Sequence, residues 1–258
     1  MKKNMTDAGH GGYDSGAPGV HGCLEKDIVL DINNRVDKYL KNQDIENSNT
    51  RTTDVFVTLN DRTNKANSLG VNSFVSIHCN SSDNPSAQGL ETYCYKFAYR
   101  PLADAIHSEL IEDGLYTKNR GVKEGNLHVV RETNMDACLV ELGFITNEDD
   151  YNLIMNNKDR FAKAIAKGIC KFNGVTWKES GSTGEGFANG DYSGKRARVT
   201  ADILNVRWDR GIEYDVIGQV KNGDIVNLQY CLNDWVSIEG FKGNKGLGYV
   251  NSKYLELL

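Results

Sequence analysis

The chain has 258 residues, a length that accommodates two domains of ordinary size. Apolar residues make up 39% of it and charged residues 25%, which is typical of a globular protein and excludes a disordered chain. The formal net charge is only −5 and no dense run of Lys and Arg occurs, so the composition argues against a nucleic-acid partner.

The N-terminal residues predict no export. Residues 1–7 begin with two lysines, but no apolar stretch follows them, so they do not form a secretory signal. The chain also lacks a run of about eighteen apolar residues, so we expect no membrane span. We therefore expect synthesis in the cytoplasm without a signal peptide.

Helices and strands are predicted to alternate through the first two thirds of the chain. Short apolar runs predict strands at residues 73–78, 90–95 and 137–141. Three stretches carry apolar side chains at helical spacing and predict helices. The first has Ile28, Ile32, Val36 and Leu40, the second has Leu102, Ile106 and Leu110 after Pro101, and the third has Phe161, Ile165 and Ile169. This alternation predicts an α/β fold whose sheet is covered by helices on both faces.

Composition divides the chain into two parts. Residues 179–194 read ESGSTGEGFANGDYSG and contain no Leu, Ile or Val, so they cannot bury a core. We predict a first domain at residues 1–175, a flexible linker at 176–196 and a second domain at 197–258. Short β-rich runs at 203–206, 215–218, 224–228, 235–238 and 248–250 predict that the second domain is a small all-β barrel.

The six cysteines are predicted to be reduced and structural. None forms a C-x-x-C pair, and most lie in apolar runs such as Cys138-Leu139-Val140. A cysteine nucleophile is the alternative chemistry, and His78-Cys79 is its best candidate pair. Adjacent residues of a strand point to opposite faces, so these two side chains cannot act on each other.

Four polar residues mark a candidate site. His10 lies in the glycine-rich turn Asp7–Gly12, and His78 and Glu141 each follow an apolar run. Glu25 stands at the start of the first helix, where negative charge suits the helix dipole. In strand–helix alternation, ligands collect at the carboxyl ends of strands. Two histidines and one carboxylate form a catalytic zinc set, and a further carboxylate off the metal can move protons.

Taken singly, these residues also have structural interpretations. A lone histidine at a strand end is usually hydrogen-bonded, and Glu25 alone suits a helix start. Glu141 is harder to explain structurally, because an acid directly after Ala-Cys-Leu-Val is costly to bury away from a site. The remaining histidines, His21, His107 and His128, lie in polar stretches or within a helix, and we assign them no metal role.

Seven segments in order resemble the zinc-dependent N-acetylmuramoyl-L-alanine amidases over nearly all of residues 4–172. They are Asp7–Gly12, Glu25–Asp27, Thr50–Thr52, Ser76–Asn80, Gly89–Tyr93, Arg120–Lys123 and Leu139–Phe144. The resemblance implies a mixed sheet flanked by helices and one zinc ion per chain, held by His10, Glu25 and His78, with Glu141 as the catalytic carboxylate. It further implies cleavage of the amide bond between N-acetylmuramic acid and the L-alanine of the stem peptide in bacterial peptidoglycan.

Three features depart from that family's usual pattern. Proline usually stands where this chain has Ala8, the first strand is usually more apolar than Lys2–Thr6, and Met-Pro-Ala usually stands where this chain has Met135-Asp136-Ala137. None of these departures touches a proposed ligand, so they bear on a loop, on the burial of one strand and on substrate contacts. The alternatives that remain open are a non-catalytic peptidoglycan-binding protein on the same scaffold and a zinc peptidase that cuts within stem peptides.

Residues 197–258 look like a bacterial SH3-like domain, a type of domain that commonly binds cell-wall peptides. The segments that carry this resemblance are Leu204–Arg207, Val216–Gly218, Gly223-Asp224, Trp235-Val236 and Gly248–Val250. An amidase joined to such a domain without a signal peptide resembles a phage endolysin of a Gram-positive host, which acts on the wall after release. The segment has no histidine and is rich in aromatic residues, so we predict that it binds the wall and does not catalyse.

Overall fold

The computed structural model describes residues 1–178, 187–201 and 203–258, and they form two compact units that divide between Lys178 and Glu179. The predicted linker falls partly on residues 179–186, which lie outside the described residues. Its last part, residues 187–196, is packed: Phe187 is buried in the second unit and stacks on Tyr192, with ring centroids 4.9 Å apart. The second unit therefore begins before residue 197.

The first unit is built on a six-stranded mixed sheet of order β2-β1-β3-β6-β4-β5. Only the β6–β4 pair is antiparallel, and every other neighbouring pair is parallel. The mixed sheet that the family resemblance implies is confirmed. The strands are β1 (Lys2–Ala8), β2 (Ile45–Asn49), β3 (Ser73–Asn80), β4 (Leu90–Cys94), β5 (Asn119–Glu124) and β6 (Asp136–Phe144).

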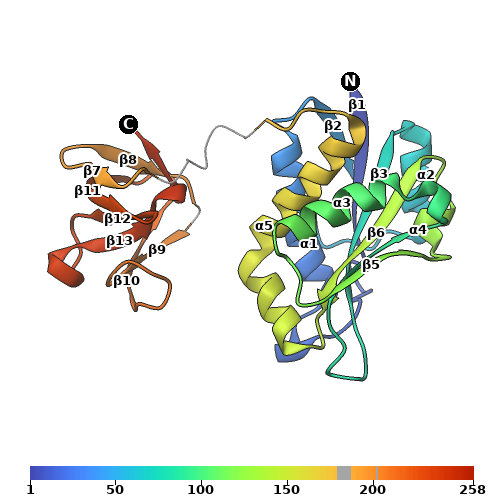
Figure 1. The fold of residues 1–258 in the computed structure, drawn as a ribbon, viewed down its shortest axis with the longest axis horizontal. Helices are drawn as coiled ribbons and strands as arrows, with labels where there is room; N and C mark the ends of the chain where they lie inside the picture. The colour runs from blue at the N-terminus through green and yellow to red at the C-terminus, as the bar shows by residue number, and fades with distance from the viewer. Residues whose placement is uncertain (179–186, 202) are drawn as a thin grey trace. The chain divides into compact units, whose positions relative to one another are not determined.

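Helices cover both faces of this sheet (Figure 1), as the strand–helix alternation predicts. One face carries the long helices α1 (Glu25–Leu40), α3 (Pro101–Glu112) and α5 (Glu148–Asn173). The other carries α2 (Leu59–Leu69) and α4 (His128–Arg131). Two short 3-10 turns, η1 (Val20–Gly22) and η2 (Phe97–Tyr99), complete the unit. None of the helices in the described part of the chain has the length and apolar character needed to cross a membrane.

Alternation along the central strands decides which side chains reach which face. Val75 and Ile77 of β3 pack in the core beneath α1, α3 and α5, whereas Phe74 packs in the core beneath α2 and α4. His78 stands four residues after Phe74 on β3, and Glu141 stands two residues after Leu139 on β6. Residues separated by two or four positions on a strand point to the same face. The two polar residues therefore lie on the α2–α4 side of the sheet.

The strands run further than the apolar runs predict. β3 continues to Asn80 and β6 to Phe144, so His78 and Glu141 lie near the carboxyl ends of their strands and not at the last residue. The extension has a backbone cause, because Asn80 pairs with Phe144 after a register shift and its carbonyl accepts from the amide of Ile145. The shift occurs beside the candidate site, where bulges commonly re-aim side chains.

The second unit is all-β and antiparallel, as predicted, with the order β10-β9-β13-β12-β11-β8-β14 and β7 paired to β11 in its described residues. Its core includes Val206, Leu228, Val236 and Val250. Its strands are β7 (Gly190–Asp191), β8 (Arg196–Val199), β9 (Ile203–Arg207), β10 (Val216–Lys221), β11 (Ile225–Leu232), β12 (Trp235–Ile238), β13 (Gly248–Asn251) and β14 (Leu255–Leu257), with 3-10 turns η3 (Asn244–Gly246) and η4 (Ser252–Tyr254).

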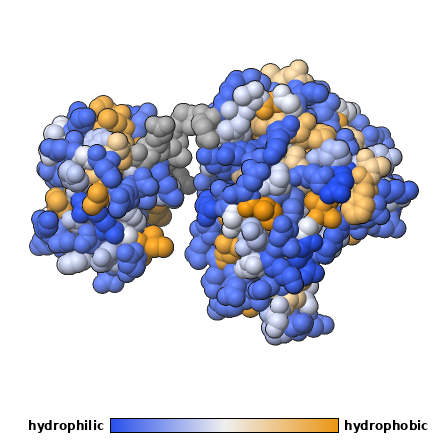
Figure 2. All heavy atoms as spheres, viewed as in Figure 1, coloured by the Kyte–Doolittle hydropathy of each residue, from blue (hydrophilic) through white to orange (hydrophobic). Residues whose placement is uncertain are grey.

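Hydrophilic side chains cover most of the face seen in Figure 2, on both units. The six cysteines all lie in the described residues, and none forms a disulfide. Five are buried and Cys23 is half-buried, so their predicted structural role agrees with their surroundings. Burial raises the pKa of the Cys79 and Cys138 thiols, which keeps them protonated and unreactive.

Candidate active site

His10 lies just beyond the carboxyl end of β1 in a constrained backbone. Its φ of 59° is in the left-handed region, which a residue with a Cβ adopts at an energetic cost. Two arginines hold this turn: Arg62 Nη2 donates to the His10 carbonyl at 2.7 Å, and Arg51 Nη2 donates to the Gly9 carbonyl at 2.7 Å. The turn therefore presents the imidazole in one fixed direction.

Glu25 is the first residue of α1, and its carboxylate points back to the carboxyl ends of the strands. It is 3% exposed. Its two oxygens accept from the backbone amides of Ala17 and Cys79, each at 2.9 Å. The same oxygens lie 3.1 Å from His10 Nε2 and 2.9 Å from His78 Nδ1. One buried carboxylate thus touches both histidines.

The three side chains form the one cluster in the described residues whose ligand atoms are placed to hold a metal ion. One ligand atom from each of His10, Glu25 and His78 lies within 4.8 Å of the others, and the two imidazole rings are 4.9 Å apart. Tetrahedral zinc with bonds of about 2.0–2.1 Å separates its ligand atoms by about 3.3 Å. The contacts of Glu25 with His10 Nε2 and His78 Nδ1, at 3.1 and 2.9 Å, are close to this value, and the whole set lies within 4.8 Å, so the donor set fits zinc in its chemistry.

The carboxylates around the two imidazoles change the pKa values of the cluster. Burial alone would raise the pKa of Glu25, but hydrogen bonds from His10 and His78 outweigh it and hold the pKa far below its usual value. Burial would lower the pKa of both histidines, and Glu25 reverses this and raises it. The carboxylate of Glu25 thus favours positive charge at this cluster.

Asp14 orients His10 from behind. Its carboxylate oxygens lie 3.0 and 3.1 Å from His10 Nδ1, on the opposite side of the ring from Glu25. A carboxylate on the far nitrogen fixes the tautomer and direction of a metal-binding imidazole and strengthens it as a ligand. Sequence reasoning missed Asp14, although its position four residues after His10 in the same turn was the available signal.

A buried ion pair supports the turn from inside the sheet. Arg62 Nη1 donates to Asp7 at 2.6 Å and to the Ala8 carbonyl at 2.7 Å. Asp7 also accepts from the hydroxyls of Ser76 and Thr50, each at 2.6 Å. Every atom of this network is fixed by a partner, which rigidifies the backbone that carries His10.

Glu141 lies directly opposite His78 across the β3–β6 pair. Its Oε2 is buried and has no hydrogen-bond partner among the described residues. Burial raises the pKa of Glu141 to about 7; His78 opposes the rise and Glu25 adds to it. A carboxyl group with this pKa can take up and release a proton near neutral pH.

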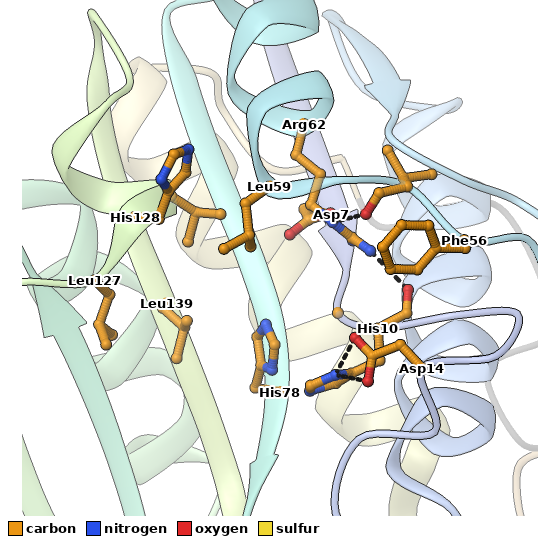
Figure 3. A pocket seen from close by; sticks show the side chains of 13 residues that line it. Asp7, His10, Asp14, Phe56, Leu59, Arg62, His78, Leu127, His128 and Leu139 are labelled. Atoms are coloured by element: carbon orange, nitrogen blue, oxygen red, sulfur yellow. Dashed lines mark hydrogen bonds and ion pairs between the residues drawn. The ribbon is translucent and has the colours of Figure 1, made fainter.

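A cavity of about 470 Å³ opens over the two histidines. Figure 3 shows His10, Asp14 and His78 at one end, and Leu127, Leu139 and His128 toward the other. His128, which the sequence placed in a polar stretch, starts the short helix α4 and lines the same cavity. The other two histidines agree with structural roles, because His21 lies 3.0 Å from Glu148 and His107 contacts Thr92 and Asn119.

The structure thus brings together His10, Glu25 and His78, with Glu141 on the adjacent strand. These side chains come from a post-strand turn, a helix start and two strands that are far apart in the sequence. The sequence did not predict that Asp14 and Arg62 hold His10 in place, or that His128 lines the cavity.

This fold matches that of peptidoglycan amidases of known structure. The catalytic domain of CwlV, an amidase from Bacillus (Paenibacillus) polymyxa var. colistinus, is 37% identical with a TM-score of 0.66 and aligns over 68% of this chain and 100% of that one. The endolysin of Bacillus phage SPP1 is 38% identical over 188 residues, 68% of each chain. The uncharacterised Bacillus subtilis protein YqiI is 42% identical over 175 residues, 65% of this chain and 83% of that one.

Family models account for both units. Residues 5–171 match the model for N-acetylmuramoyl-L-alanine amidase, and residues 202–256 match the bacterial SH3 domain. The chain therefore belongs to the N-acetylmuramoyl-L-alanine amidase family, whose members hydrolyse peptidoglycan, and carries a C-terminal bacterial SH3 domain.

Proposed function

We propose that this amidase depends on one zinc ion per chain, held by His10, Glu25 and His78, and that Glu141 is its proton carrier. The observation that supports the proposal best is the placement of three ligand atoms within 4.8 Å of one another, with the buried Oε2 of Glu141 free on the strand next to His78. A scaffold that only bound peptidoglycan would have no need for this complete set.

The residues divide the chemistry between them. When bound, zinc supplies a Lewis acid that polarises a carbonyl group and promotes the ionisation of water near neutral pH. Glu141 accepts a proton from the attacking water and delivers a proton to the departing amine, while the C–N bond breaks and a C–O bond forms. Asp14 holds His10 in direction, and Leu127 and Leu139 form an apolar part of the cavity wall.

The bond we propose as the target joins the lactyl carbonyl of N-acetylmuramic acid to the amine of the first L-alanine. Digestion of purified cell walls should then release new amino termini that belong to alanine. New reducing sugar ends would identify a glycosidase instead, and other new amino termini would identify a peptidase that cuts within the stem.

Substitution of the two key residues tests the division of roles. Glu141→Gln keeps the shape of the side chain and removes its basicity, so it should retain about one zinc per chain and lose at least about 100-fold in activity. His78→Ala should lose zinc and activity together. Glu112→Gln, an exposed acid on α3, serves as the matched control and should change neither. Full activity in Glu141→Gln would show that this acid is structural.

We further propose that the SH3 unit binds the wall and that the protein acts as an endolysin. Trp208 and Tyr214 are 44% and 36% exposed, with ring centroids 6.3 Å apart, and such aromatic pairs suit flexible peptide or sugar ligands. Similarity to the SPP1 endolysin supports the lytic role. Expression inside a Gram-positive cell should be tolerated until the membrane is permeabilised, and lysis with an intact membrane would contradict this role.

A further inference from the structure

A row of charged side chains crosses the sheet away from the candidate metal ligands. His78 on β3 is opposite Glu141 on β6, and Glu141 is in turn opposite Glu91 on β4. The next strand, β5, carries Arg120 and Lys123. Because neighbouring strands lie about 4.8 Å apart, Glu91 is about 10 Å from His78 across the sheet. The row therefore leads from the reacting centre to the β5 edge.

Glu91 gathers two cations around one carboxylate. It is 2% exposed, and it accepts from Arg120 Nε at 2.5 Å and from Lys123 Nζ. It also accepts from the Tyr93 hydroxyl at 2.8 Å and from Asn80 Nδ2 at 2.7 Å. Burial would raise its pKa, but the two cations and Tyr93 hold the pKa at about 2. The cluster thus carries one negative charge and two positive charges.

The two cations remain open to solvent. The side chains of Arg120 and Lys123 are 29% and 36% exposed, although the carboxylate beneath them is buried. The guanidinium carbon of Arg120 lies 5.0 Å from the centroid of the Phe144 ring, and this stacking fixes the plane of the guanidinium group. Its Nη1 makes one long bond to the Gln88 carbonyl at 3.4 Å, and its Nη2 has no partner among the described residues. Donor capacity is therefore left for an external anion.

The chemistry of the substrate supplies such an anion. In peptidoglycan the residue after L-alanine is a D-glutamate joined through its side chain, so its α-carboxyl group is either free or amidated. It lies about two residues beyond the scissile bond, a span of about 7 Å for extended chain. This span, together with the length of an arginine side chain, covers the distance between the His78 and Arg120 ends of the row.

We propose that Arg120 and Lys123, positioned by Glu91, bind the free α-carboxylate of the second stem-peptide residue. This inference rests on the proposed amidase function and assigns the leaving side of the substrate to the β5 edge of the sheet. It makes the enzyme selective for stems whose second residue is not amidated. A network with a purely structural role would give no such selectivity.

Two synthetic muramyl pentapeptides that differ only at this group test the inference. One carries D-isoglutamate and the other D-isoglutamine at the second position. The full-length wild-type enzyme should cleave the acid with a kcat/KM about tenfold higher than the amide, in line with one charge-assisted pair. Arg120→Gln and Lys123→Gln should each reduce this ratio, mainly by raising KM for the acid, and should reduce kcat/KM for the amide by a smaller factor than for the acid.

Arg100→Gln is the control, because Arg100 pairs with Asp104 on α3, on the other face of the sheet, and should keep the wild-type ratio. Equal cleavage of acid and amide by the wild-type enzyme would overturn the inference without reference to any variant. A parallel loss on both peptides in Arg120→Gln would also overturn it and assign a structural role. Cleavage of neither peptide would contradict the proposed function itself, and this inference with it.

Discussion

Gly9 is the position where the smallest change should disturb the candidate metal site most. A Cβ added at Gly9 would lie 2.3 Å from Cε1 of His78, and 2.6 and 2.7 Å from its two ring nitrogens. Ordinary contact begins at 3.4 Å, so the ring must retreat by about 1 Å. It cannot do so and keep its 2.9 Å contact with Glu25. A displacement of about 1 Å at a reacting centre costs about 100-fold in rate.

We therefore expect Gly9→Ala to bind zinc at least about tenfold more weakly and to lose about 100-fold in kcat/KM. Zinc-buffered titration and the clearing of wall suspensions measure the two quantities. Gly168→Ala is the control, since its Cβ would meet Ile106 Cα at 2.5 Å between α5 and α3, away from the site. It should lower the melting temperature and leave zinc affinity intact. Wild-type zinc affinity in Gly9→Ala would refute the reasoning.

Three further outcomes follow from the contacts described. Asp14→Asn should weaken zinc binding about 10- to 100-fold in the same titration, because it removes the carboxylate behind His10. A chain ending at Lys178 should keep zinc and cleave small muramyl peptides, yet bind whole walls more weakly in a sedimentation assay than the full chain. Asp7→Asn should lower the free energy of unfolding by about 3–5 kcal/mol near neutral pH, because it leaves Arg62 buried without its partner.

Periodicity predicted the parts of the fold that bury apolar stripes. The 3.6-residue spacing located α1, α3 and the second half of α5, and apolar runs located β3, β4 and β6. It failed at α2, whose inward residues are Arg62, Thr63 and Ala66, so no apolar stripe exists to be found. It also missed the edge strands β2 and β5, which are largely polar because one side of each has no neighbouring strand.

The sequence predicted the residues of the candidate site, but it did not predict the buried polar contacts that hold them in place. Strand ends and a glycine-rich turn predicted His10, His78 and Glu141 because ligands collect at such positions. The buried pair of Asp7 with Arg62 could not be predicted, because charged residues are normally exposed. Their burial is tolerated only when a partner in the folded structure offsets the cost of desolvation. The same holds for Glu91, whose partners stand about thirty residues further along the chain.

The Asp7–Arg62 pair also determines how the stability of the first unit depends on pH. Burial acts to raise the pKa of Asp7, but Arg62 and the hydroxyls of Ser76 and Thr50 outweigh it, so the folded pKa lies below the ordinary value. In the unfolded chain the pKa is about 3.9. A depressed folded pKa contributes stability that is fully present above the unfolded pKa and is lost as pH falls toward the folded value.

The destabilisation caused by Asp7→Asn should therefore be largest above about pH 5 and should shrink as the pH falls below about 4, because the asparagine cannot lose this contribution. Urea unfolding of wild type and variant at a series of pH values measures the difference. Asp61→Asn, an exposed acid on α2, is the control and should give a difference several times smaller throughout. A penalty for Asp7→Asn that stays constant from pH 7 to pH 3 would show that hydrogen bonding alone, and not the charge on Asp7, holds Arg62 and the turn that carries His10.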